Sequence, residues 1–361
     1  MNDSIYVHIP FCASKCGYCA FYSAPAGDEV YDGYVKALIN QIKNTERRPE
    51  SEIKSVFFGG GTPSVLGSGR LYSILEALDE KFGISSAERT TELNPDSVED
   101  LLSEGDLPLF FNRFSMGAQS FCDEELLLLG RRHDSESAKR AFYRLRDFGA
   151  ENINIDIMLA LPHENHEKKL EKTLGTLREL SPEHVSAYIL TVESGTPFAK
   201  KYVSDEDLGE RCYFKVCDFL SDCGYEHYEI SNFAKPDKRC DHNMGYWTQR
   251  PYYAFGPQAC GFDGKNRFRN DCTTTEFIEK NGIIAPKIEE TLSQKALADE
   301  KNMLALRLSD GTDSDIFTEN NKKFIEMLLR KGFAKMNKNG GISLTDRGFL
   351  VSNTIITQLL G

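Results

Sequence analysis

The sequence contains no long hydrophobic run and is short of positive charge. No apolar stretch reaches the ~18 residues of a membrane-spanning helix, and no basic segment followed by an apolar run stands near the first residue. We therefore expect neither a spanning helix nor a secretory signal. Lysine and arginine number 43 against 55 aspartate and glutamate residues, which gives a net charge of −12. This balance argues against a general nucleic-acid binder, which needs a basic surface.

Cysteine, in contrast, is not scarce, because the chain has ten. Without a secretory signal we expect reduced thiols that are available for metal, as in a cytoplasmic protein, rather than a disulfide framework. The 361 residues suit either two to three domains or one large α/β barrel with an extension.

Three of the cysteines lie in one short segment, Cys12-Ala13-Ser14-Lys15-Cys16-Gly17-Tyr18-Cys19. This C-x3-C-x2-C run directly follows an apolar, β-branched segment, residues 5–9. Thiolates at this spacing can converge on one iron–sulfur cluster. A [4Fe–4S] cluster held by three cysteines leaves one iron for a small chelating molecule. The alternative is a zinc site or unrelated cysteines, but structural zinc commonly takes two separated pairs, and no second C-x2-C follows.

Strand-like segments alternate with helical patterns over residues 1–200. The helical patterns repeat apolar residues at three- and four-residue steps, as in residues 28–44. Alternation of this kind implies parallel strands joined by helical crossovers. We therefore predict the α/β class and a partial (β/α)6 barrel, with strands near 5–9, 55–58, 90–94, 112–116, 152–158 and 185–190.

Polar or glycine-rich residues mark these strands at or near their ends. The Cys segment follows the first strand and Gly59-Gly60-Gly61-Thr62-Pro63 follows the second, while Glu92, Gln119 and Asp156 belong to the next three. In α/β barrels the active site gathers at the carboxyl ends of the strands, so we predict one shared site. The glycine run lacks P-loop or dinucleotide spacing. Taken alone it also fits a tight turn.

Together these residues resemble the radical S-adenosylmethionine (SAM) superfamily. More narrowly, they resemble the group that contains oxygen-independent coproporphyrinogen III oxidase and the HemW-type haem chaperones. The resemblance runs nearly end to end, with motif order and spacing in agreement. The stretches that carry it are Tyr6–Cys12, the Cys segment, Gly59–Pro63, Glu92–Pro95, Met116–Phe121, Leu129–Arg131 and Asn154–Asp156.

The resemblance implies a role for each of these stretches. A [4Fe–4S] cluster would be bound by Cys12, Cys16 and Cys19, and the amino and carboxylate groups of SAM would chelate its fourth iron. Backbone groups would contact the amino-acid end of SAM at Gly60, Gly61 and Thr62. The other SAM-contacting positions would be Tyr6, Tyr18, Glu92, Gln119, Arg131 and Asp156. For each of them the alternative is a buried polar group satisfied within the protein.

Two features separate the members of this group. The oxidase has a further cysteine two positions after the third, where this chain has Phe21. The segment His242-Asn243-Met244-Gly245-Tyr246-Trp247 matches the H-N-x-x-Y-W pattern of the HemW type. Imidazole is a natural haem ligand and aromatic rings flank porphyrins, so the haem candidates are His242, Tyr246 and Trp247. A packed loop histidine is the alternative, and further candidate ligands are Cys240, Cys260 and Cys272.

In the last part of the chain the sequence pattern predicts helices near 292–308, 322–331 and 346–360, with a hairpin at Asn339-Gly340-Gly341. This order resembles a winged-helix module within an α+β extension. Its stretch 321–347 holds seven basic and two acidic residues. We expect a barrel at 1–200, a connecting α/β region with the H-N-x-x-Y-W segment at 201–285, and a C-terminal domain at 286–361.

The sequence thus predicts a radical SAM protein of the HemW type that binds haem and delivers it to apoproteins. Its expected cofactors are the [4Fe–4S] cluster and SAM, and its expected electron source is a flavodoxin- or ferredoxin-type donor. One alternative is a coproporphyrinogen III oxidase, an oxidoreductase that decarboxylates propionate side chains. The other is a DNA-binding regulator acting through the tail. Catalytic cleavage of SAM and peripheral membrane contact stay open at this point.

Overall fold

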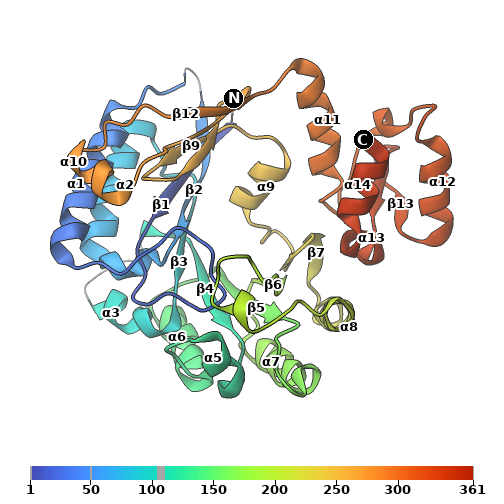
Figure 1. Cartoon of the computed structure of the whole chain (residues 1–361), viewed down its shortest axis with the longest axis horizontal. Helices are drawn as coiled ribbons and strands as arrows, with labels where there is room; N and C mark the ends of the chain where they lie inside the picture. Colours follow the sequence, from blue (N-terminus) through green and yellow to red (C-terminus); the bar gives the residue numbers. More distant parts are fainter. Residues whose placement is uncertain (1, 49–50, 104–109, 361) are drawn as a thin grey trace.

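The computed structural model describes residues 2–48, 51–103 and 110–360, and its centre is a curved sheet of twelve strands (Figure 1). Six neighbouring strands run parallel in chain order, as the alternating pattern predicts. They are β1 (Asn2–Ile9), β2 (Glu52–Gly60), β3 (Glu88–Leu93), β4 (Arg113–Gln119), β5 (Ile153–Leu159) and β6 (His184–Ile189). The predicted partial (β/α)6 barrel is therefore confirmed.

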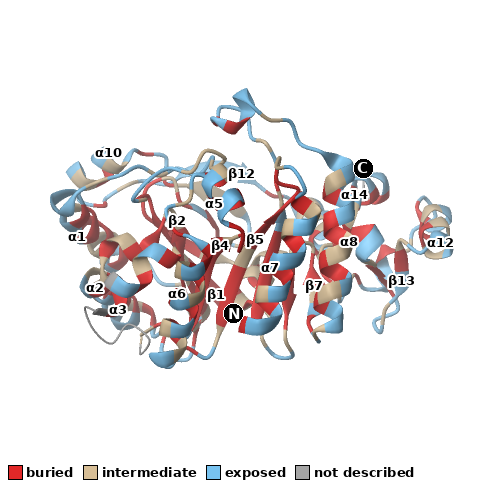
Figure 2. Cartoon of the chain, turned by 90° about the horizontal axis from the view of Figure 1, so that it is seen from below, coloured by how far each residue is buried: buried red, intermediate tan, exposed pale blue. Residues whose placement is uncertain are grey.

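Helices cover the outer face of this sheet (Figures 1 and 2). On β1, Ile5, Val7 and Ile9 are fully buried in the core beneath them, because successive side chains of a strand alternate between its two faces. The covering helices are α1 (Asp28–Asn44), α2 (Ser68–Phe82), α3 (Val98–Ser103), α5 (Asp123–Leu129), α6 (Ser135–Asp147) and α7 (His166–Leu180).

The inner face of the barrel carries polar side chains. Ser55 on β2 donates a hydrogen bond to Ser4 on β1 at 2.8 Å. Asn154 on β5 donates to Ser115 on β4 at 2.8 Å and meets His184 Nδ1 on β6 at 2.6 Å. Closed (β/α)8 barrels fill this space with branched apolar residues. The polar lining therefore equips the interior of this barrel for polar ligands.

Both edges of the parallel section are extended by later parts of the chain. β9 (Tyr252–Phe255) pairs in parallel with β1, followed by β10 (Cys260–Phe262), β11 (Asn266–Arg269) and β12 (Lys287–Thr291). Beyond β6 lie β8 (Asn232–Ala234) and β7 (Glu226–Glu229). The predicted boundary at 285/286 would detach β12 from this sheet. The domain division stays a prediction, and the sheet favours a boundary after Thr291.

Three helices connect these strands. α8 (Glu206–Asp222) packs against β5, β6 and β7, and α10 (Thr274–Glu279) packs against α1. α9 (Asp241–Trp247), which carries the H-N-x-x-Y-W segment, lies within the curve of the sheet and contacts β1 and β2 (Figure 1). This helix therefore occupies part of the barrel interior.

The C-terminal elements form a lobe beside β7 and α8 (Figure 1). They are α11 (Gln294–Ala305), α12 (Lys322–Lys331), the hairpin β13 (Ala334–Met336) and β14 (Ile342–Leu344), α13 (Asp346–Leu350) and α14 (Ser352–Leu360). The single helix predicted at 346–360 is wrong: Val351 leaves the helical conformation, with φ −112° and ψ 22°. Among the described residues, no helix combines the length and apolar character that crossing a bilayer requires.

Candidate cofactor site

The Cys segment forms a loop at the carboxyl end of β1. Its base is closed by two backbone hydrogen bonds, from Cys12 N to Ala24 O at 3.3 Å and from Ala24 N to Pro10 O at 3.0 Å. The thiols of Cys12, Cys16 and Cys19 are free and half-buried. The loop therefore presents three sulfurs without disulfide partners at the carboxyl ends of the strands, where the other predicted site residues also lie.

A chain of polar side chains holds two of these sulfurs. Thr62 Oγ1 donates to Cys12 Sγ at 3.5 Å, and Arg131 Nη1 donates to Cys16 Sγ at 3.5 Å. Asn94 joins the two, because it donates to Thr62 Oγ1 at 3.1 Å and accepts from Arg131 Nη2 at 2.6 Å. The sequence places Asn94 with Glu92 at the end of the third predicted strand, and so at the shared site, but assigns it no contact with a ligand.

The donor set fits an iron–sulfur cluster. Cys19 N donates to Cys16 O at 3.2 Å, and the pKa of the Cys19 thiol is raised by burial and then by the charges of the other two cysteines. The three sulfurs are thus near enough to influence one another's ionisation. Arg131 supplies a cation beside them, and its Nε is buried with no hydrogen-bond partner among the described residues. That donor is free for an anionic ligand group such as a carboxylate.

The glycine run is shaped by its contact with the Cys loop. Gly61 N donates to Ile9 O at 2.8 Å and Thr62 N to Phe11 O at 2.7 Å. A Cβ on Gly61 would stand 2.2 Å from Phe11 O, so only glycine permits this approach. Gly60 has φ +106°, and its N–H donates to Glu92 at 3.2 Å. These amides are used within the protein, and so is the Thr62 carbonyl, which accepts from Val65 N at 3.1 Å.

Two carboxyl groups face the interior below the loop. Burial and the nearby Asp156 raise the pKa of Glu92 to about 8. Burial also raises the pKa of Asp156, which accepts a hydrogen bond from Asn154 at 2.7 Å. A carboxyl group that stays protonated near neutral pH can donate as well as accept. The pair is therefore suited to the hydroxyl groups of a neutral polyol such as a ribose.

The remaining predicted SAM contacts lie around the same edge. The Tyr6 hydroxyl meets His8 Nδ1 at 3.0 Å, and the Tyr18 phenol has its pKa raised chiefly by burial, beside Arg131. Gln119 adopts φ +68°. Its side-chain nitrogen lies so close to Gly117 that a Cβ added there would stand 2.9 Å from it. The structure thus brings the predicted cofactor residues together at one end of the barrel. Their individual roles stay predictions.

The predicted haem candidate His242 lies deeper in the barrel. Its side chain is 1% exposed and stacks on Phe57 at 5.0 Å between ring centroids. Its Nδ1 meets Ser55 Oγ at 3.0 Å and its Nε2 meets the Tyr246 hydroxyl at 2.9 Å. Burial, with Arg250 and Arg113, lowers the pKa of His242 to about 3. Both ring nitrogens are engaged, whereas an iron ligand needs one of them free.

The other haem candidates differ in their access to solvent. Trp247 is half-buried and lies 5.5 Å from the Arg307 guanidinium, away from the hydrogen bond that joins His242 to Tyr246. Cys240 and Cys272 are buried, whereas Cys260 is exposed. Of His242 and the three cysteines, only Cys260 thus offers its donor atom to a ligand without a change in the surrounding structure.

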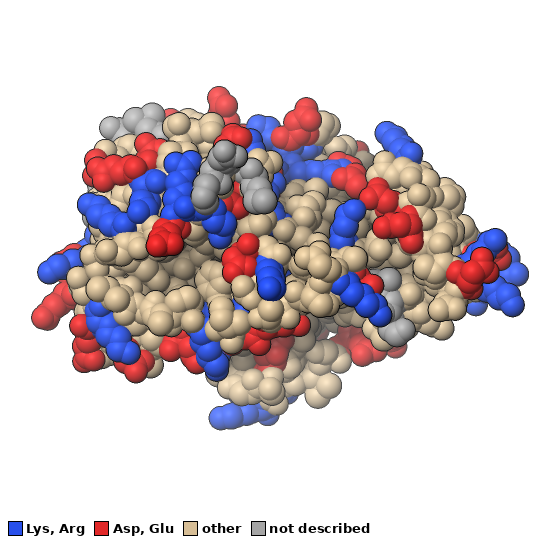
Figure 3. All heavy atoms as spheres, turned by 90° about the horizontal axis from the view of Figure 1, so that it is seen from above, with Lys and Arg blue, Asp and Glu red and all other residues tan. Residues whose placement is uncertain are grey.

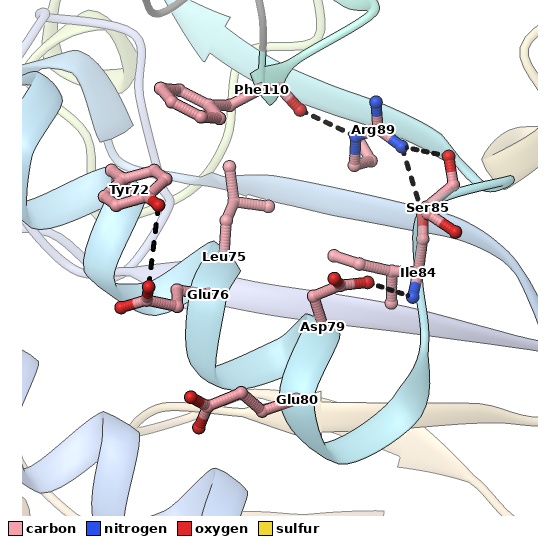
Figure 4. Close-up of a pocket in the computed structure, with 9 residues that line it drawn as sticks. All are labelled: Tyr72, Leu75, Glu76, Asp79, Glu80, Ile84, Ser85, Arg89 and Phe110. Atoms are coloured by element: carbon pink, nitrogen blue, oxygen red, sulfur yellow. Dashed lines mark hydrogen bonds between the residues drawn. The ribbon is translucent and has the colours of Figure 1, made fainter.

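A cavity of about 460 Å³ lies elsewhere, between α2 and the segments that carry Arg89 and Phe110 (Figure 4). Its polar groups are paired within the protein: Arg89 donates to Phe110 O at 2.6 Å and to Ser85 O at 2.7 Å, and Asp79 accepts from Ile84 N at 2.8 Å. It contains none of the predicted site residues. The chemistry therefore points to the end of the barrel and not to this hollow.

Comparisons with known proteins agree with this assignment. The radical SAM superfamily profile matches residues 6–177. The chain is 30% identical to the haem chaperone HemW of Lactococcus lactis, over 99% of this chain and 97% of that protein. It is also 30% identical to the haem chaperone HemW of Bacillus subtilis, over 99% of both chains. Among solved structures, coproporphyrinogen III oxidase of Escherichia coli superposes with a TM-score of 0.81 at 22% identity, covering 99% of this chain and 90% of that one. At that identity the likeness shows the fold.

Proposed function

We propose that this chain, which belongs to the HemW family of radical SAM proteins, binds haem and delivers it to apoproteins. The observation that carries the proposal is the near end-to-end relation to haem chaperones from two bacteria. The cofactors of the family are a [4Fe–4S] cluster and SAM, which supply radical chemistry when bound. The protein supplies their placement and the exclusion of water.

The geometry supports an assignment of roles within the cofactor site. The cluster ligands are Cys12, Cys16 and Cys19. Arg131 Nε would serve the SAM carboxylate, and the carbonyls of Gly60 and Gly61 would accept from the SAM amino group. Glu92 and Asp156 bind ribose hydroxyls, while Tyr6, Tyr18 and Gln119 line the same space. Asn94 hydrogen-bonds both Thr62 and Arg131 and so holds each of them beside the sulfur that it contacts.

The haem site has two candidate ligands with different requirements. Ligation by His242 requires that Ser55 or Tyr246 release a ring nitrogen, whereas the Cys260 thiol is already exposed. Phe21 follows the Cys loop and is 67% exposed. Its ring would offer a porphyrin an apolar surface beside that loop. Both candidates are testable by haem titration.

One assay separates a chaperone from an oxidase. The protein is reconstituted anaerobically and given SAM, a reductant and coproporphyrinogen III. We expect stoichiometric haem uptake in a parallel titration and no protoporphyrinogen IX. Formation of that product over many turnovers would reject the chaperone assignment in favour of the oxidase.

Haem titration of four proteins then locates the ligand. If His242 binds iron, Tyr246→Phe frees Nε2 and tightens haem binding, whereas His242→Asn abolishes the histidine signature of the haem spectrum. If Cys260 binds iron, Cys260→Ser removes a thiolate signature and the other two variants leave it unchanged. The Cys223→Ser variant, which alters a half-buried thiol at the end of α8, is the matched control.

We further propose a cytoplasmic location and a flavodoxin- or ferredoxin-type electron donor. On the face shown in Figure 3, basic and acidic side chains are interspersed, without a basic stripe for nucleic acid. We expect no DNA binding even at low salt. Reduction of the cluster by a purified flavodoxin, followed by its visible absorbance, tests the donor. Co-sedimentation with anionic vesicles tests peripheral membrane contact.

A further inference from the structure

Three potential metal ligands converge where the barrel meets the C-terminal lobe, away from the cofactor site. They are Cys217 on α8, His227 on β7 and Asp346 at the start of α13. Their ligand atoms all lie within 4.8 Å of one another. We propose that these residues bind a divalent transition metal of the Zn²⁺ type, which fastens the C-terminal lobe to the last strand of the large sheet.

The orientation of the His227 ring favours a metal at this point. Its Nε2 lies 3.2 Å from Ile230 O, an acceptor, and the ring stacks on Phe233 at 4.1 Å with 13° between the planes. Because a carbonyl oxygen only accepts hydrogen bonds, this contact places a proton on Nε2. In the neutral ring the lone pair then resides on Nδ1, the nitrogen that faces the other two ligands.

The contacts of Nδ1 complete the argument. Asp346 Oδ1 lies 2.8 Å from it and Cys217 Sγ lies 3.9 Å from it. With Nε2 protonated, Nδ1 and the carboxylate are two acceptors in contact, and they require a cation between them. A second proton on the ring satisfies this need, and so does a metal ion. The Cys217 thiol also hydrogen-bonds Tyr213, and metal binding would replace that contact with a bond from sulfur to the ion.

The ligand set and its exposure indicate the kind of metal. Sulfur, imidazole nitrogen and carboxylate oxygen are the donors that Zn²⁺ takes, at about 2.0–2.3 Å. Cys217 is buried, His227 is nearly so, and the Asp346 side chain is half-exposed. Three protein ligands with solvent on one side leave the fourth tetrahedral position to water. Because two ligands come from the barrel and one from the lobe, metal binding would couple the two parts.

The test uses the protein with its [4Fe–4S] cluster already loaded, so that the Cys loop does not compete for metal. Co²⁺ is the probe, because a bound thiolate gives a charge-transfer absorption. We expect one equivalent of Co²⁺ to produce this band, and Zn²⁺ to displace it. Cys217→Ser should abolish the band, whereas Cys223→Ser, the half-buried thiol just after α8, should keep it.

Asp346→Asn provides the variant that does not threaten folding, because its side chain lies half in solvent. We expect Co²⁺ affinity to fall at least about tenfold, since even outer partners of metal sites have effects of this size. Zn²⁺ should raise the thermal midpoint of the wild type and not that of this variant. No band in the wild type, or a band of equal affinity in Asp346→Asn, would overturn the proposal and leave only a His–Asp ion pair.

Discussion

The two ends of the barrel interior handle buried polar groups in opposite ways. The cofactor end, which carries the Cys loop, Glu92 and Arg131, keeps an unpaired arginine nitrogen and a carboxyl pair of raised pKa. The closed end, which α9 fills with His242, satisfies both nitrogens of its histidine. Unpaired buried groups are costly unless a ligand completes them. The closed end also keeps a buried nitrogen, Arg113 Nε, that has no partner in the described part of the chain. The contrast between the two ends therefore rests on the carboxyl pair and the Cys loop at one end and on the fully bonded His242 at the other.

The closed end is built around the start of α9. Glu88, the first residue of β3, accepts hydrogen bonds from Asp241 N and His242 N, each at 3.1 Å. A carboxylate at this position satisfies free amides at the N-terminus of the helix. The helix is therefore anchored inside the barrel through its backbone as well as through its histidine. A ligand that reached His242 would have to loosen this anchor.

The largest effect should come from the Cys loop at the cofactor end. Cys16→Ala removes one of the three proposed cluster ligands and the acceptor of the Arg131 hydrogen bond. We expect a complete loss of the cluster after anaerobic reconstitution, measured as iron and sulfide per chain. Cys260→Ser, which alters an exposed thiol outside the loop, should keep full iron. A normal iron content in Cys16→Ala would place the cluster elsewhere.

The second-largest effect should come from a substitution at the closed end. His242→Ala leaves the Tyr246 hydroxyl without its partner and removes one of the two hydrogen bonds of Ser55, which keeps its bond to Ser4. An unpaired buried group costs about 1–3 kcal/mol, and the lost ring adds a cavity. We expect the free energy of unfolding to fall by about 3 kcal/mol in urea titrations, while iron content per folded chain stays normal. His163→Ala, at a histidine that is partly exposed, is the control. An unchanged unfolding midpoint together with loss of haem binding would show His242 to be a ligand instead.

Asn94→Ala should have a smaller effect, confined to the cofactor end. It removes the link between Thr62 and Arg131, but Arg131 keeps its hydrogen bond to Gly117 O at 2.6 Å. We expect the cluster to form and SAM affinity to fall about tenfold, equivalent to ~1.4 kcal/mol, by equilibrium dialysis. Asn44→Ala on the exposed side of α1 should not change SAM affinity. Equal affinity in both variants would remove Asn94 from the site.

The same contrast explains what could be predicted from sequence. The cofactor end follows from local patterns, since the cysteine spacing, the glycine run and the alternating strands each reside in a short segment. The closed end does not, because His242 is 187 residues from its partner Ser55, and β9 pairs with β1 from the far side of the chain. The H-N-x-x-Y-W pattern marked His242 as notable but could not show that its nitrogens are occupied. The break at Val351 likewise carries no proline or glycine signal.

The smallest effect is on the pH dependence of stability, where the two ends have opposite signs. Glu92 has its pKa raised from 4.5 to about 8, so the folded protein holds a proton that the unfolded chain releases, and stability falls as pH rises through this range. His242 has its pKa lowered from 6.5 to about 3, so its contribution is lost as pH falls below 6.5. Between pH 6.5 and about 8 the slope comes from Glu92 and from His166, whose pKa, against the effect of burial, hydrogen bonds to Cys212 and Glu125 raise to about 9.

This window gives a clean test on protein without cluster or SAM. Wild-type stability should decline across it, by at most ~1.4 kcal/mol per pH unit for each proton, and Glu92→Gln should reduce the decline to the part that His166 contributes. His242→Asn should leave the slope above pH 6.5 intact while it alters the slope below. A Glu92→Gln protein with the wild-type slope would mean that the proton resides on Asp156, whose pKa burial also raises. Asp156 would then be the carboxyl group that donates a hydrogen bond to a polyol, and Glu92 the one that accepts. The contrast between the two ends of the barrel would still hold.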